Sequence, residues 1–170
     1  MSRRKDPSDH LDPARKPKIV HVIPPGAPGY REAAGGSMVV STPAEVDGLV
    51  RRVGRGEVIT LDDLRQALAR RHGTAVACPV STAIFVNMCA RAAEDRRSRG
   101  EDPGKLTPWW RVLKRGGLLN PKLPGGVERQ KALLAEDDVH ASPLRRQLAV
   151  YDYEERKPSH PLEGKRLSRE

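Results

Sequence analysis

Two cysteines, five histidines and a pair of adjacent tryptophans are the residues whose types could do chemistry. Cys78 and Cys89 are eleven residues apart in one expected helix, which separates their Cα atoms by roughly 16 Å, too far for a disulfide. Free thiols are typical of a reducing compartment. The histidines are scattered and show no metal-ligand spacing with either cysteine. We therefore expect no disulfide, no metal and no cofactor.

The tryptophans, Trp109 and Trp110, are two of only six aromatic residues in the chain. The indole nitrogen is a hydrogen-bond donor only, so neither side chain can accept an alkyl group or a proton. One interpretation is a cleft wall that stacks on a nucleic-acid base, worth about 1–3 kcal/mol per base. The other is a core position that buries about 150–250 Å² per ring. The sequence leaves both open.

The distribution of charge favours a polyanionic partner. The net charge is +9, and residues 109–131 hold six basic side chains against a single acid, Glu128. Such an excess suits nucleic acid, although a solvated basic surface explains it equally well. Lys114, Arg115 and Lys122 are the candidates for phosphate contacts, because they fall in expected turn and loop segments.

Helix start and stop signals outline a helical core. Thr60 and Asp63 form a capping-box pattern, and Pro79 suits the first position of a helix. Glycines and proline-rich loops separate the expected helices, which span residues 42–53, 60–72, 79–93 and 126–136. The second and third helices, joined by a short turn, could form a helix-turn-helix, although many such pairs are only packing units.

Segments outside these helices complete the expected organisation. Residues 109–119, with a turn at Gly116-Gly117, are expected to form a small hairpin or wing. Residues 1–40 are rich in proline, glycine and charge and predict a disordered or extended arm. Residues 140–170 predict a charged C-terminal tail. The fold class is thus mainly α with a small β-hairpin, a winged helix-turn-helix-like domain over residues 41–139 with extended tails.

One stretch of the chain resembles a known family. It reads Pro108-Trp109-Trp110-Arg111-Val112-Leu113, then Gly116-Gly117, then Leu123-Pro124-Gly125-Gly126, then Arg129-Gln130 and Leu133-Leu134-Ala135-Glu136. In order and spacing it resembles the DNA-binding domain of the O6-alkylguanine-DNA alkyltransferases, whose reactive motif is Pro-Cys-His-Arg-Val. Gly56-Glu57-Val58-Ile59-Thr60 is similar to the start of that family's helix-turn-helix. The resemblance covers residues 41–139.

The resemblance implies a DNA-binding role for named residues. Trp109 stands where the reactive cysteine would be, as in alkyltransferase-like proteins, which bind alkylated DNA without repairing it. Trp110 replaces the histidine, and Leu61 replaces a tyrosine. These three form the implied lesion pocket. Ala83 stands where the family has an arginine finger that fills the space of a flipped base, so base flipping is in doubt. The implied DNA-binding residues are Ser81, Thr82, Ala83, Asn87, Arg111, Lys114, Arg115 and Lys122, with Arg111 alternatively structural.

The expected function is non-catalytic binding of double-stranded DNA, in particular alkylated DNA, with a repair protein as a further partner. Transfer needs a thiolate and a nearby base, and the motif supplies neither, so we expect no enzyme. A protein-interaction or regulatory module that keeps the fold is the alternative, and a transferase that uses Cys78 is a third. With no long apolar run or signal peptide, we expect a cytoplasmic monomer without membrane contact.

Overall fold

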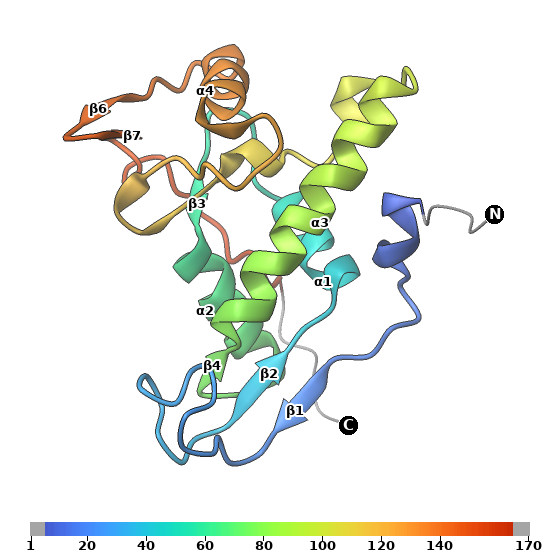
Figure 1. Ribbon diagram of the computed structural model, residues 1–170, viewed down its shortest axis with the longest axis vertical. Coiled ribbons are helices and arrows are strands. Elements are labelled where there is room, and N and C mark those ends of the chain that lie inside the picture. The colour runs from blue at the N-terminus through green and yellow to red at the C-terminus, as the bar shows by residue number, and fades with distance from the viewer. Residues whose placement is uncertain (1–5, 165–170) are drawn as a thin grey trace.

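The computed structural model describes residues 6–164 and is mainly helical, as the sequence predicts (Figure 1). The helices of this described part are α1 (Pro43–Val50), α2 (Leu61–His72), α3 (Pro79–Ser98) and α4 (Gly126–Glu136), with short 3₁₀ turns between them. Small sheets connect them. No helix within residues 6–164 has the length and apolar character needed to cross a membrane.

The core lies where α1 and α2 pack against α3. Val46 and Leu49 of α1, Leu64 and Leu68 of α2 and Val86 of α3 are all buried in it. Their spacing of three and four residues places each set on one face of its helix. This packing fixes the inner face of α3, while Val80 and Ile84 on its outer side remain exposed.

Capping interactions set where α2 begins and ends. The Thr60 hydroxyl accepts from the Asp63 amide at 3.2 Å, and the Asp63 carboxylate accepts from the Thr60 amide at 2.8 Å. This reciprocal pair confirms the predicted capping box. Gly73 ends the helix with φ +65°, a left-handed conformation that costs glycine little. The start of the helix-turn-helix pair is therefore determined locally by sequence.

Two small sheets position the ends of these helices. β2 (Met38–Val40) pairs antiparallel with β1 (Lys18–Val20) and parallel with β4 (Val76–Ala77). β3 (Ile59–Thr60) pairs parallel with β5 (Val112–Leu113). Because β4 leads into α3 and β3 leads into α2, the two sheets fix the N-terminal ends of both helices.

The hairpin is not where the sequence predicts it. Residues 109–119 form a 3₁₀ turn, the strand β5 and a second 3₁₀ turn, because β5 pairs with β3 instead of with Leu118 and Leu119. The antiparallel hairpin lies instead in the expected tail, as β6 (Ser142–Leu144) and β7 (Gln147–Ala149). The Leu119 amide donates to the Leu148 carbonyl at 2.9 Å, so the expected wing segment pairs with this hairpin.

Both terminal segments are more structured than expected. Ile23 is buried, β1 pairs with β2, and the 3₁₀ turn Pro7–Leu11 packs on α1 and α3. On the C-terminal side, the Val58 amide donates to the Arg156 carbonyl at 3.0 Å and Leu162 is buried. A few apolar anchors joined by backbone hydrogen bonds suffice to attach these polar segments, which composition alone does not reveal.

Candidate nucleic-acid interface

The outer face of α3 is the most exposed helical surface with apolar side chains. Val80 and Ile84 are 53% and 48% exposed, and Ala83 beside them is also exposed. Asn87 extends this face by one further turn and is half-buried. Residues spaced by three and four lie on one side of a helix, so these four form a continuous strip. We call this strip, Val80, Ala83, Ile84 and Asn87, the α3 face.

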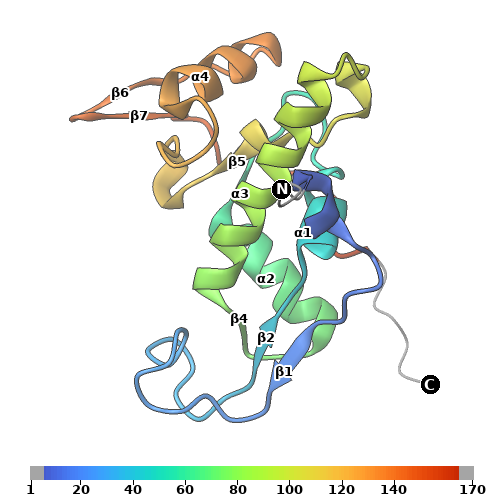
Figure 2. The same ribbon diagram turned by 45° about the vertical axis from the view of Figure 1, so that its right-hand side comes forward.

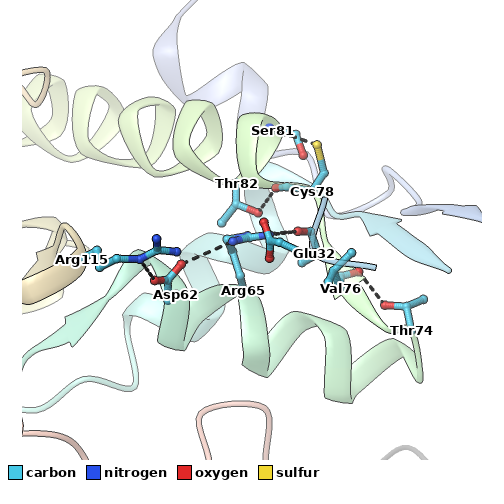
Figure 3. A network of polar contacts seen from close by, with 10 residues as sticks. Glu32, Asp62, Arg65, Thr74, Val76, Cys78, Ser81, Thr82 and Arg115 are labelled. Carbon is cyan, nitrogen blue, oxygen red and sulfur yellow. Dashed lines mark hydrogen bonds and ion pairs between the residues drawn. The ribbon is translucent and has the colours of Figure 1, made fainter. Parts of the chain in front are cut away.

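Ser81 and Thr82, which the sequence analysis grouped with Ala83, do not share this face. Thr82 is 1% exposed, and its hydroxyl donates to the Cys78 carbonyl at 2.7 Å. The Ser81 hydroxyl oxygen is buried, and the Ser81 amide donates to the Cys78 sulfur at 3.5 Å. The expectation that Thr82 contacts DNA is wrong, because the helix turns it into the core (Figure 3).

A loop beside α3 carries the first of the basic candidates. The Asn87 side-chain amide donates to the Lys122 carbonyl at 2.6 Å, which attaches the loop 120–125 to the α3 face. The Lys122 amide in turn donates to the Asn120 side chain at 3.0 Å. Lys122 itself is exposed. The structure thus brings Lys122 and Asn87 together, as the predicted set of DNA-binding residues requires.

Gln130 holds this loop by a hydrogen bond. No role beyond membership of the motif was predicted for it. It is fully buried, and its side-chain oxygen accepts from the Asn120 amide at 2.8 Å. Its amide nitrogen donates to the carbonyls of Trp110 and Val112 at 3.1 and 3.0 Å. A buried glutamine must satisfy both ends of its amide, and here this need ties α4, the loop and the motif together.

Arg115, the second basic candidate, lies next to the start of α2. Its guanidinium is 2.7 Å from the Asp62 carboxylate, although its side chain is 82% exposed. The hydrogen bond from Arg115 holds the pKa of Asp62 below its usual value. Lys114 precedes it and is half-buried. An ion pair this exposed adds little stability, so Arg115 can exchange its partner for a phosphate at little cost.

Asp62 also belongs to a chain of ion pairs that reaches the N-terminal segment (Figure 3). The buried Arg65 lies 3.4 Å from Asp62 and 2.8 Å from Glu32, and it donates to the Ala77 carbonyl at 3.1 Å. A cavity of about 360 Å³ lies next to this network. Because its cations and carboxylates pair with each other, we interpret the network as a tie between α2, β4 and the segment around Glu32.

The tryptophans do not form the expected lesion pocket. Trp109 is 0% and Trp110 7% exposed, and their rings meet edge to face with centroids 6.0 Å apart. The Trp109 indole donates to Glu94 at 3.1 Å and the Trp110 indole donates to Asp137 at 2.8 Å. Leu61 is only partly buried, but it packs on the same core. Neither indole is accessible to a base, so the core interpretation holds for both.

Arg111 is a structural residue in this arrangement. Its guanidinium binds Asp137 in a fork at 2.6 and 3.0 Å and donates to the Val53 carbonyl at 2.8 Å. It also lies over the Trp110 ring, 5.4 Å from the centroid. With its donors occupied inside the protein, Arg111 is not available to DNA. Of the two interpretations of this arginine, the structure supports the structural one.

Both cysteines of the described part of the chain are free and buried. Cys89 is buried, its sulfur donates to the Pro43 carbonyl at 3.3 Å, and burial raises its pKa far above the usual thiol value. Cys78 is buried as well. His72 of α2, the histidine nearest to Cys78 in the sequence, binds Glu45 at 2.5 Å. Residues 6–164 also contain no cluster of metal-ligating side chains.

Comparison with known proteins gives one structural match. No protein-family model matches the chain, and no curated protein sequence matches it. Among solved structures, the chain is similar to S. pombe Atl1, whose crystal structure is a complex with damaged DNA containing O6-carboxymethylguanine. The identity is 19%, the match covers 69% of this chain and 94% of the other, and the TM-score is 0.47. A likeness this limited leaves the function to be argued from the chain's own residues.

Proposed function

We propose that this protein binds double-stranded DNA without catalysis, through the α3 face and the basic side chains beside it. The observation that carries the proposal is the exposed strip on α3, to which Asn87 attaches the loop of Lys122, together with the exposed Arg115 at the start of the neighbouring helix α2. Small and apolar side chains allow a helix to approach a groove closely, while lysine and arginine neutralise phosphates. Backbone contacts of this kind position a protein on DNA and read little sequence.

We further propose that alkylated duplexes are preferred, a point that rests on the motif within residues 108–136. Direct stacking by Trp109 and Trp110 finds no support, because both rings are buried. Val80 and Ile84 offer another route. Apolar side chains in the minor groove can wedge between base steps, and a damaged base pair costs less to unstack. Preference would then arise from deformability of the duplex, with no base flipped into the protein.

The absence of catalysis is part of the same proposal. Trp109 offers only a donor that is already bonded to Glu94, and Cys89 is kept protonated by burial. Without a thiolate and its base, an alkyl group has no acceptor. Incubation with an O6-methylguanine duplex should therefore leave the mass of the chain unchanged. A methyl group found on Cys78 would make the protein a transferase.

Fluorescence anisotropy with plain and O6-methylguanine duplexes tests DNA binding. Three phosphate contacts from Lys114, Arg115 and Lys122 should give a slope of about −2.7 or steeper for log K against log salt. Ala83→Glu places a carboxylate on the α3 face and should weaken binding more than about tenfold. Ala132→Glu, an exposed alanine of α4, is the matched control and should bind like the wild type.

A protein-interaction module is the second candidate, because Val80 and Ile84 form an exposed apolar pair on α3. Such pairs are common at the centre of protein interfaces. The two functions separate in the same measurement. A chain that ignores duplex DNA at low ionic strength, or binds it with no dependence on salt, would exclude the DNA function and leave the protein partner.

A further inference from the structure

The hairpin β6–β7 projects from the body of the molecule in both views (Figures 1 and 2). Its base is firmly attached, because Leu118 forms a bridge with Ala149 and the Val150 amide donates to the Gly117 carbonyl at 2.9 Å. The Tyr151 hydroxyl also donates to the Pro143 carbonyl. The hairpin is therefore held in a defined direction at its base and is free at its tip.

The tip carries two adjacent arginines, Arg145 and Arg146, both exposed. Arg145 adopts φ +56°, a left-handed conformation that closes the turn between the strands. In the described part of the chain neither guanidinium has a carboxylate within ion-pair distance. The next acids along the sequence, Asp152 and Glu154, are paired with Arg156 and Lys157. The two charges at the tip are thus available to a partner.

A shallow groove runs beside the tip. It has a volume of about 580 Å³, and its lining consists of Leu118, Leu144, Arg145, Arg146 and Gln147. Much of its lining is apolar, since Leu118 and the exposed Leu144 contribute to it beside the two arginines. An apolar surface next to two guanidinium groups fits a sugar-phosphate strand, which presents both ribose carbons and charged phosphate.

Backbone hydrogen bonds connect the hairpin to the segment that carries Lys114 and Arg115. Its base is bonded to residues 117–119, and Lys114 and Arg115 come directly before them in the chain. Two bonded segments thus carry four cations, Lys114, Arg115, Arg145 and Arg146, and within residues 6–164 only Arg115 among them forms an ion pair, with Asp62. Like charges gathered in this way repel each other in the free protein, and a polyanion relieves that repulsion.

We propose that the β6–β7 hairpin is a second DNA-contacting element, in which Arg145 and Arg146 bind phosphates of the duplex that the α3 face engages. This inference rests on the proposed function, because it places both elements on one duplex. It raises the phosphate-binding side chains from three to five and extends the contacted DNA beyond α3. It also gives a role to the segment that the sequence analysis treated as a charged tail.

The double variant R145Q/R146Q tests the inference by anisotropy with the plain duplex. Five phosphate contacts should give the wild type a slope of about −4.5, and loss of two should reduce it to about −2.7. Affinity at low salt should fall about tenfold, because each arginine makes an exposed contact that contributes modestly to binding. R146Q alone, which leaves Arg145 and its turn conformation intact, should give an intermediate slope near −3.6.

A matched control comes from another adjacent basic pair. R15Q/K16Q removes the same charge from exposed positions in the segment before β1 and should keep the wild-type slope. If R145Q/R146Q keeps that slope too, while Ala83→Glu loses affinity, the hairpin inference fails and the DNA function stands. If both double variants lose the same amount of affinity and slope, the effect is one of net charge and the inference fails. If the wild type does not bind the duplex, both proposals fall.

Discussion

Asp137 binds two side chains of the motif, Trp110 and Arg111. Its carboxylate accepts from the Trp110 indole and receives the fork of Arg111, and Arg111 also donates to Val53. A buried carboxylate with several donors is strongly held, and removing one partner leaves the others uncompensated. The residue types of the motif can be read from sequence, but this partner lies 26 positions from Arg111 and becomes visible only in the fold.

The protonation of Asp137 should make stability depend on pH. Burial acts to raise its pKa, but the hydrogen bonds from Arg111 and Trp110 outweigh burial and lower the pKa below 3.8. A lowered pKa contributes stability above the ordinary carboxyl value, and this contribution is lost as pH falls through the folded-state value. Asp137→Asn should cost about 3 kcal/mol at pH 7.

Urea unfolding from pH 7 down to pH 3 measures this effect. The difference between wild type and Asp137→Asn should shrink as pH falls below the ordinary carboxyl value, because the unfolded chain then takes up a proton that the folded carboxylate, with its lowered pKa, still excludes. A surface variant, Asp152→Asn, serves as the control and should follow the wild type throughout. Curves for Asp137→Asn and wild type that stay parallel would contradict the role given to this carboxylate.

Two elements, α3 and the turn that follows β5, determine which side chains are exposed at the proposed DNA-binding surface. The helix period separates an inner side with Thr82 and Val86 from an outer side with Val80 and Ile84. At the turn of residues 115–117, Arg115 pairs with Asp62 of α2, and the following Leu118 and Leu119 pair with the hairpin. The two glycines of this turn both have positive φ, but they differ in their surroundings.

Gly116 and Gly117 form a matched pair of test positions. A Cβ at Gly117, φ +77°, would lie 2.6 Å from the Tyr153 ring and 2.7 Å from the Val150 carbonyl, whereas a Cβ at Gly116, φ +75°, meets no atom within 4 Å. Gly116→Ala should cost about 1–2 kcal/mol from backbone strain alone. Gly117→Ala should cost about 1–3 kcal/mol more from the clash. Equal losses in thermal unfolding would show that the packing around Gly117 yields easily.

For the whole molecule, the segments at both ends extend the helical core. After β7 the chain returns to the core, where the Val58 amide donates to the Arg156 carbonyl. Further along, Glu163 binds Arg70 of α2 at 2.6 Å. Val150 and Leu162 are buried along this path. The folded unit therefore extends past residue 139, where the apolar pattern of the sequence stops.

Truncation tests the contribution of this segment. A chain that ends at Val150 loses Leu162 and the bond to Val58, and its free energy of unfolding should fall by about 3 kcal/mol or more. A chain that ends at Gly164 keeps all these contacts and is the control. Equilibrium unfolding in urea distinguishes the two. Equal stability of both chains would show that the segment after Val150 contributes nothing to the stability of the fold.

Features that act over a few residues can be predicted from the amino-acid sequence. Thr60 with Asp63 begins α2, Gly73 ends it, and the indole of Trp109 excludes a nucleophile at that position, because capping, backbone conformation and side-chain chemistry are local properties. Which side chains stay exposed to solvent depends on the tertiary structure. It buried Trp109 and Thr82, and it engaged Arg111 with Asp137. It also paired the wing segment with a hairpin that starts at Ser142. Burial and strand pairing depend on residues distant in sequence, so no local pattern encodes them.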